Sequence, residues 1–252
     1  SNDILEIAAR ALLHPGVSAV YSEHAFAVYP LATQASGARP IVVPARHYGH
    51  DLEAMAAAIA PDTRIVFIAN PNNPTGTFVP AAEVQAFLER VPENVVVVLD
   101  EAYNEYLDEA DRFDSSRWIA RHPNLLVSRT FSKAYGLASL RVGYGLAQAE
   151  LTDLLNRVRQ PFNVSSPALA AAEAALADRE FVERSRSLNR SELARLERAF
   201  AEMGLEYLPS YGNFSLVRVG KAAEVYEGLL RAGVIVRPVA GYGLPEWLRV
   251  SV

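Results

Sequence analysis

Short apolar runs alternate with longer stretches of helical periodicity along most of the chain. Six β-branched runs predict strands at residues 17–22, 39–43, 64–69, 95–99, 124–128 and 141–146. Helical patterns lie between them, as at 51–59 and 80–90, and Asp3 and Glu6 have the spacing of a capping box for a first helix. Strands that are apolar throughout and separated by helices indicate an α/β fold, with a mostly parallel sheet and helices on both faces.

The pattern changes near residue 180. Residues 181–204 form a long, charged helical pattern that ends at Gly204. Its apolar positions recur near helical spacing, at Leu188, Leu193, Leu196, Phe200 and Met203. Strand-like runs at 214–219, 234–237 and 248–252 follow, with a helix that ends at Ala232. We therefore expect a large domain over residues 1–179 and a smaller C-terminal α/β domain over residues 180–252.

Composition and charge narrow the classes of function. The net charge of −5, without a basic tract, argues against nucleic-acid binding. Cysteine is absent, which excludes disulfides, thiolate metal sites and cysteine nucleophiles. The longest apolar runs, such as 95–99, are too short to cross a bilayer, and no targeting segment is visible. We expect a cytoplasmic protein with no nucleic-acid or membrane partner.

Two further kinds of site find little support. His47, His50 and Asp51 are close in sequence but lack the helical spacing of zinc ligands, so we predict no metal. No Gly-x-Ser-x-Gly elbow is present, and Gly241 and Gly243 do not fit a dinucleotide fingerprint. A hydrolase triad and a dinucleotide site are therefore not expected.

Four motifs follow predicted strands, where parallel sheets collect ligands. They are residues 70–76 (NPNNPTG), 100–103 (DEAY), 128–136 (SRTFSKAYG) and 141–144 (RVGY). Taken singly, the first reads as a turn, the second as a helix-capping acid, and Lys133 as a solvated surface residue. Their combination, in this order and each at a strand end, indicates one shared site.

These motifs resemble those of fold-type I pyridoxal-phosphate-dependent aminotransferases of class I and II, and the resemblance covers all 252 residues. Within that family the chain looks most like the histidinol-phosphate aminotransferases. The supporting segments are 26–31 (FAVYPL), 72–73 (NN), 234–238 (VIVRP) and 248–251 (LRVS). The resemblance implies the fold-type I architecture, with a central sheet and a smaller C-terminal domain, and pyridoxal 5′-phosphate as cofactor.

The resemblance implies a role for each residue around the cofactor ring. Lys133 would form an imine with the aldehyde carbon and, once released, move a proton between the substrate Cα and C4′. Asp100 would pair with the pyridine nitrogen, so that the ring acts as an electron sink. Tyr103 and Asn73 would hydrogen-bond the phenolic oxygen, and Phe26 would stack on the ring.

The cofactor phosphate requires a cradle of donors. Arg141 offers a bidentate, charge-assisted pair, and Thr130 and Ser132 offer hydroxyl groups. Ser1 and Asn2 would contribute backbone amides at the N-terminus of the first helix, where anions bind readily. We expect these five residues to form the phosphate site.

Two arginines are the candidates for binding substrate. Arg249 matches the family position that binds the acidic group of the substrate. Arg237 is its expected partner in the histidinol-phosphate type, in which the amino donor carries a phosphate. Two guanidinium groups suit a phosphate dianion and would also accept the carboxylates of 2-oxoglutarate. The alternative for each arginine is a surface ion pair.

Relative to the family, the sequence lacks a segment before the first helix and a short stretch after LRVS. We therefore expect it to be part of a longer protein, with an active site that is incomplete by itself. Because this fold builds its site at a subunit boundary, we also expect a homodimer.

The leading prediction is transfer of the amino group of L-histidinol phosphate to 2-oxoglutarate, which gives imidazole acetol phosphate and L-glutamate in histidine biosynthesis. An aromatic amino-acid aminotransferase and a phosphothreonine decarboxylase are alternatives of the same fold. The sequence does not show which Cα bond stands perpendicular to the ring. A non-catalytic, aminotransferase-like regulatory domain is the alternative of a different class, and the full cofactor set from Asn73 to Arg141 argues against it.

Overall fold

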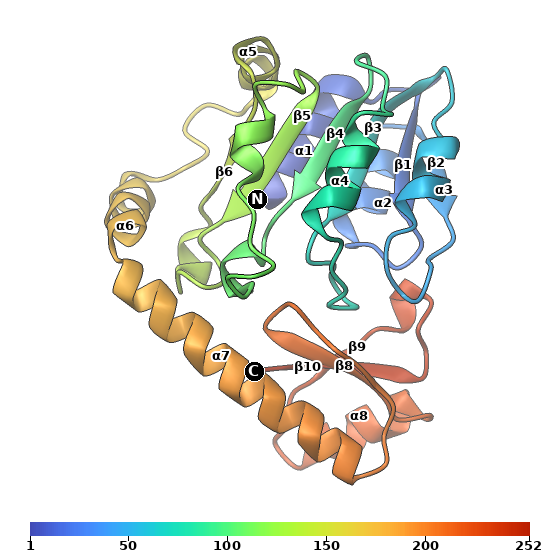
Figure 1. Ribbon diagram of the computed structural model, residues 1–252, viewed down its shortest axis with the longest axis vertical. Helices are drawn as coiled ribbons and strands as arrows, with labels where there is room; N and C mark the ends of the chain where they lie inside the picture. Colours follow the sequence, from blue (N-terminus) through green and yellow to red (C-terminus); the bar gives the residue numbers. More distant parts are fainter.

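A computed structural model describes residues 1–252 and contains two β-sheets (Figure 1). The larger sheet has six strands in the order β2-β1-β3-β4-β5-β6. Their bounds are β1 Ser18–Ser22, β2 Arg39–Val43, β3 Thr63–Ala69, β4 Val96–Asp100, β5 Leu125–Thr130 and β6 Gly143–Leu146. β1 to β5 pair in parallel and β6 runs antiparallel to β5. The prediction of a mostly parallel central sheet is confirmed.

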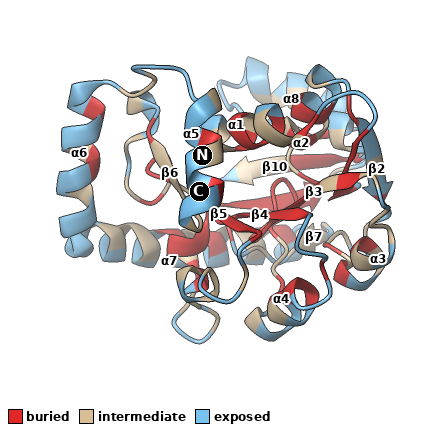
Figure 2. Ribbon diagram, turned by 90° about the horizontal axis from the view of Figure 1, so that it is seen from above, coloured by how far each residue is buried: buried red, intermediate tan, exposed pale blue.

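Helices cover both faces of this sheet. α1 (Asn2–Leu12), α2 (Val28–Ala35) and α5 (Ala149–Val158) contribute to one apolar core, and α3 (Leu52–Ala57) and α4 (Ala81–Leu88) to the other. The strands supply both cores because successive side chains point to opposite faces. In β3, for example, Ile65 and Phe67 enter the first core, and Val66 and Ile68 enter the second. Accordingly, β4 is buried throughout, and β3 is buried at every position except Arg64 (Figure 2).

A second, antiparallel sheet follows in the C-terminal part of the chain. α6 (Ser166–Ala177) and the long α7 (Arg179–Glu202) lead from the large sheet to it (Figure 1). Its strands lie in the order β7-β8-β10-β9, and α8 lies between β8 and β9 in sequence. Their bounds are β7 Tyr207–Leu208, β8 Phe214–Arg218, α8 Ala222–Arg231, β9 Arg237–Pro238 and β10 Trp247–Ser251. The domain boundary between residues 179 and 180 stays a prediction, and α7 begins beside it.

Three local predictions were wrong. Asp3 and Glu6 form no capping box, because α1 begins at Asn2 with Ser1 as its N-cap. Glu6 instead accepts a hydrogen bond from the side-chain amide of Asn2 at 2.7 Å. The strand predicted from residue 141 begins at Gly143, since Arg141 has a left-handed backbone with φ of 54°. Residues 234–236 lie outside β9.

The apolar stripe of α7 is narrower than its periodicity predicts. Leu193 and Phe200 are buried, but Leu188 and Met203 are exposed. α7 therefore packs on the second sheet along one side only. None of the helices combines the length and the hydropathy that crossing a lipid bilayer requires.

Candidate active site

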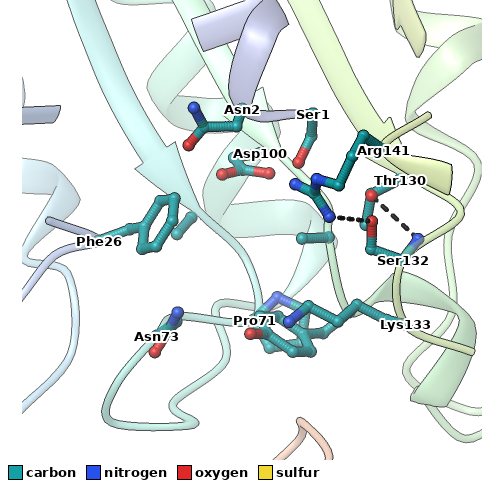
Figure 3. Close-up of a pocket in the computed structure, with 13 residues that line it drawn as sticks. Ser1, Asn2, Phe26, Pro71, Asn73, Asp100, Thr130, Ser132, Lys133 and Arg141 are labelled. Atoms are coloured by element: carbon teal, nitrogen blue, oxygen red, sulfur yellow. Dashed lines mark hydrogen bonds between the residues drawn. The ribbon is translucent and has the colours of Figure 1, made fainter. Parts of the chain in front are cut away.

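A cavity lies where β3, β4 and β5 reach their carboxyl ends, and it brings the four motifs together (Figure 3). Its volume is about 150 Å³. All of the residues predicted to surround a cofactor line it: Ser1, Asn2, Phe26, Asn73, Asp100, Tyr103, Thr130, Ser132, Lys133 and Arg141. Ala69, Pro71 and Ala102 complete the lining and were not predicted. These ten residues thus surround one cavity, and the role of each stays a prediction.

Asp100 ends β4 as a buried carboxylate with one free oxygen. Its Oδ2 accepts a hydrogen bond from the Tyr29 hydroxyl at 3.0 Å, and its Oδ1 is buried without a partner. Burial raises the pKa of Asp100, and the bond from Tyr29 opposes this rise. A buried acceptor of this kind requires a donor, and a cationic N–H would satisfy it best.

Tyr29 belongs to the site although sequence analysis gave it no role. It is fully buried on α2, and its ring stacks on Phe67 with centroids 4.7 Å apart. Burial, and then the charge of Asp100, raises the pKa of its hydroxyl, which therefore stays protonated and donates a hydrogen bond to that carboxylate. The signal in the sequence was a hydroxyl-bearing ring among the small and apolar residues of a short helix.

Lys133 is the only lysine at the cavity. The sequence contains two lysines, and the other, Lys221, is exposed and lies 3.1 Å from Glu224. The Lys133 ammonium lies 5.2 Å from the centroid of the Tyr103 ring. Burial, and then the charges of Arg249 and Arg141, lowers the pKa of Lys133. The lowered pKa favours the neutral, nucleophilic amine.

Tyr103 is buried between that lysine and the second sheet. Burial raises the pKa of its hydroxyl, so the group stays protonated and available as a donor. Its ring meets Phe214 of β8 edge to face, with centroids 5.3 Å apart. The side chain thus connects the motif after β4 to the C-terminal sheet.

Donors gather at one side of the cavity, opposite Phe26 (Figure 3). Arg141 Nη1 donates to the Ala138 carbonyl at 2.7 Å and to Ser132 Oγ at 3.4 Å. The Ser132 amide donates to Thr130 Oγ1 at 3.1 Å. The N-terminus of α1 also opens on this side, and its first amides have no partner within the helix. A guanidinium, hydroxyl groups and helix amides together suit a phosphate.

Buried amide groups hold the loop that presents Asn73. Asn70 exchanges two hydrogen bonds with the backbone of Val79, both 2.8 Å long. Asn72 donates to the His24 carbonyl at 2.9 Å and to Thr75 Oγ1 at 2.7 Å. The repeated Asn residues of this motif therefore bond the loop to itself and to the segment before α2, which leaves Asn73 at the cavity.

The second sheet meets the cavity through Arg249. Its guanidinium lies over the Phe214 ring, 4.9 Å from the centroid, and Nη1 donates to Asn73 Oδ1. Its Nε is buried without a partner. Arg237 lies opposite Arg249 in the β9–β10 register and is exposed. Neither arginine lines the cavity itself, so the structure places Arg249 at its edge and leaves Arg237 farther out.

The family model described as aminotransferase class I and II matches residues 1–252. Histidinol-phosphate aminotransferase 2 of Ralstonia nicotianae is 66% identical over 256 residues, which cover 100% of this chain and 68% of the relative. Histidinol-phosphate aminotransferase 1 of Cupriavidus pinatubonensis is 67% identical with the same coverage. The chain thus spans about two thirds of the length of these relatives.

Solved aminotransferase structures also match nearly the whole chain. Histidinol-phosphate aminotransferase from Sinorhizobium meliloti, in complex with pyridoxal-5′-phosphate, superposes with a TM-score of 0.91 and 33% identity, over 98% of this chain and 69% of that one. Aspartate aminotransferase of Thermus thermophilus, in complex with maleate, superposes with a TM-score of 0.87 over 99% of this chain and 69% of that one. At 24% identity, this second match carries the fold alone.

Proposed function

The chain belongs to the class I and II aminotransferases. We propose that it transfers the amino group of L-histidinol phosphate to 2-oxoglutarate. The products are imidazole acetol phosphate and L-glutamate, and the reaction is a step of histidine biosynthesis. The observation that carries the proposal is the identity of 66% with a histidinol-phosphate aminotransferase across the entire chain.

Pyridoxal 5′-phosphate is the cofactor, and when bound it supplies an electron sink for the substrate Cα. The unpartnered oxygen of Asp100 fits its pyridine nitrogen, because a protonated ring nitrogen is the cationic donor that a buried carboxylate lacks. Arg141, Ser132 and Thr130 would hold its phosphate, together with the amides at Ser1 and Asn2.

Lys133 would attach the cofactor and later carry the proton to and from the substrate Cα. Its lowered pKa supports both tasks, since a neutral amine attacks a carbonyl and accepts a proton. Tyr103 and Asn73 would donate to the phenolic oxygen of the ring, and Phe26 would cover one ring face.

Arg249 and Arg237 would bind the phosphate of the amino donor and the carboxylates of the keto acid. Arg249 already lies at the cavity edge, and its buried Nε lacks an acceptor. Arg237 is exposed and forms no ion pair. As a register pair on neighbouring strands, the two residues lie side by side on one face of the sheet, where both guanidinium groups would bind one anion.

The same proposal includes a homodimer that acts in the cytoplasm, the location expected for amino-acid synthesis. Phe162 is fully exposed on the loop before α6, and Leu31 is exposed on α2. A second copy of the chain would cover such apolar groups. Light scattering should give the mass of a dimer, and a stable, active monomer would contradict this part.

The decisive experiment follows the visible absorbance of the bound cofactor while one amino donor is added without a keto acid. Histidinol phosphate should convert the bound cofactor to its pyridoxamine form at a lower concentration than the other donors. More efficient conversion by phenylalanine would identify an aromatic aminotransferase, and release of carbon dioxide from phosphothreonine would identify a decarboxylase. No conversion by any of the three would contradict a transaminase.

A further inference from the structure

A buried ion pair lies beside the cavity, between β4, which ends at Asp100, and β5, which leads into the loop of Lys133. Glu101 follows Asp100 and is fully buried, and Arg129 precedes Thr130 in β5 with a side chain that is 16% exposed. Arg129 Nε donates to Glu101 Oε2 at 2.8 Å, and Nη2 lies 2.8 Å from the same oxygen. Neither residue lines the cavity, so any effect on the chemistry must act through a neighbour.

Alternation along the strands explains this placement. Asp100 and Thr130 line the cavity. Their neighbours in sequence, Glu101 and Arg129, therefore project to the other side of the sheet. Asp100 and Ser128 are the last register pair of β4 and β5, and the Glu101 amide then donates to the Ser128 carbonyl at 2.8 Å. Beyond this bond the chains enter the loops of Tyr103 and Lys133. The ion pair is therefore the side-chain link at the point where these two loops begin.

Arg129 is also held from two further elements. Its Nη2 donates to Ser115 Oγ at 3.4 Å, in the 3-10 turn Ser115–Trp118, and Tyr144 of β6 lies opposite it in the antiparallel register. Burial alone would lower the pKa of Arg129, but the Glu101 carboxylate outweighs this and holds that pKa above its usual value. The guanidinium therefore stays charged, and its hydrogen bonds to Glu101 and Ser115 fix its orientation.

Stability alone does not account for such a pair. Two charges lose their hydration on burial, and apolar side chains of similar volume often stabilise a fold equally well or better. An apolar pair, however, has no preferred direction, whereas two guanidinium nitrogens that each lie 2.8 Å from Oε2 fix the position of that oxygen. The pair is therefore better suited to fixing geometry than to adding stability.

We propose that Glu101 and Arg129 are positioning residues that hold Asp100 in place relative to Lys133, and so set the pH at which the bound cofactor changes its visible absorbance. The proposal rests on the proposed function, because it concerns the cofactor that this function requires. Asp100 would pair with the ring nitrogen, and Lys133 would bind the aldehyde carbon of the same conjugated ring. A change in the distance between Asp100 and Lys133 would therefore change how strongly the carboxylate stabilises positive charge on the cofactor, and with it the pH of the absorbance change.

The test compares holoenzymes of three variants with wild type. Glu101→Gln and Arg129→Met each break the pair, and the double variant Glu101→Leu/Arg129→Met replaces it with an apolar contact. Asp62→Asn is the matched control, because it breaks the exposed Arg39–Asp62 pair, which lies 2.8 Å apart at the far edge of the same sheet. The measurements are the absorbance–pH curve without substrate, kcat and KM, and the melting temperature.

Each single variant should shift the midpoint of the absorbance curve by at least about half a pH unit. Each should also lower kcat by about tenfold or more, with KM within about twofold of wild type. The double variant should regain the melting temperature but neither the midpoint nor kcat, and Asp62→Asn should match wild type in all three.

A double variant that recovers both midpoint and kcat would overturn the proposal, because the pair would then be merely structural. Folded single variants with the wild-type midpoint would overturn it equally. If a single variant fails to fold, the double variant decides. Since the midpoint is read without substrate, it tests the ion pair even if wild type failed to convert histidinol phosphate, an outcome that would count against the proposed function instead.

Discussion

Burial moves the pKa values of Asp100 and Lys133 in opposite directions, and both shifts favour the uncharged form. The carboxyl is buried beside Tyr29 and the amine beside Tyr103, so neither is fully solvated. A cationic ring nitrogen would return Asp100 to its charged form, because the two charges then compensate each other. The cavity is thus poised for a ligand that brings its own positive charge.

Replacing Lys133 with alanine should remove both covalent attachment and proton transfer. We expect turnover to fall by at least about 10⁴-fold, with cofactor still bound non-covalently. Borohydride reduction followed by peptide mapping should find no label in this variant. Lys221→Ala is the control, since Lys221 is exposed and away from the cavity, and it should retain label and activity. A reducible linkage in Lys133→Ala would mean that another amine holds the cofactor.

The residues of the site could be predicted to the extent that they lie in short local motifs. Asp100 and Tyr103 share one motif, and Thr130, Ser132 and Lys133 share another, so the resemblance was enough to name them. Tyr29 could not be assigned in this way, because its partner Asp100 is 71 positions away. The Glu101–Arg129 pair was missed for the same reason, since a contact through space leaves no periodic signal.

At the scale of elements, β-branched runs located the central strands to within one or two residues. β3 is typical, since Thr63–Ala69 was predicted from residue 64. Prediction failed where tertiary contacts decide, as at β9, where only Arg237 and Pro238 pair with β10 although the apolar run begins at Val234. The apolar pattern does not show where a partner strand ends, so this boundary could not be predicted.

The contact between α1 and β6 depends on a glycine. A Cβ on Gly143 would meet the backbone nitrogen of Ser1 and lie 2.7 Å from the Arg129 carbonyl oxygen. Gly143→Ala should therefore push the start of α1 away from the phosphate site. We expect cofactor affinity to fall about tenfold and stability to fall by about 1–3 kcal/mol, measured by equilibrium dialysis and urea unfolding.

Gly228→Ala provides the matched control for this substitution. Gly228 lies within α8, and a Cβ there has no atom within 4 Å. Alanine should be neutral or stabilise by about 0.5–1 kcal/mol, with unchanged cofactor affinity. Wild-type affinity in Gly143→Ala would show that α1 does not contribute to the phosphate site.

At the scale of the whole molecule, the two sheets meet around the loop of residues 70–78. Arg249 donates to Asn73, the Tyr211 amide donates to the Gly76 carbonyl at 2.8 Å, and the rings of Phe78 and Tyr211 stack with centroids 4.9 Å apart. The sequence predicted that both parts exist, but it carried no signal for the contacts between them. These contacts place the candidate substrate arginine at the edge of the cofactor cavity.

Arg249→Ala should raise KM for both substrates, because one guanidinium serves the phosphate of the donor and the carboxylate of the acceptor. The loss of a charged hydrogen bond predicts a rise of about 10- to 100-fold, measured by steady-state kinetics with each substrate varied. Arg218→Ala is the control, since Arg218 lies in the same sheet but is exposed and paired with Glu206 and Glu246. An unchanged KM in Arg249→Ala would place the anion clamp elsewhere.

The scarcity of lysine has a consequence for how the holoenzyme assembles. The 24 basic residues are two lysines and 22 arginines. A free aldehyde condenses with unprotonated amines, and guanidinium groups stay protonated at any physiological pH. The arginine-rich surface therefore keeps its positive charge while offering an incoming aldehyde almost no competing side-chain amine. Within these 252 residues, composition alone therefore limits condensation of the aldehyde at the wrong amine.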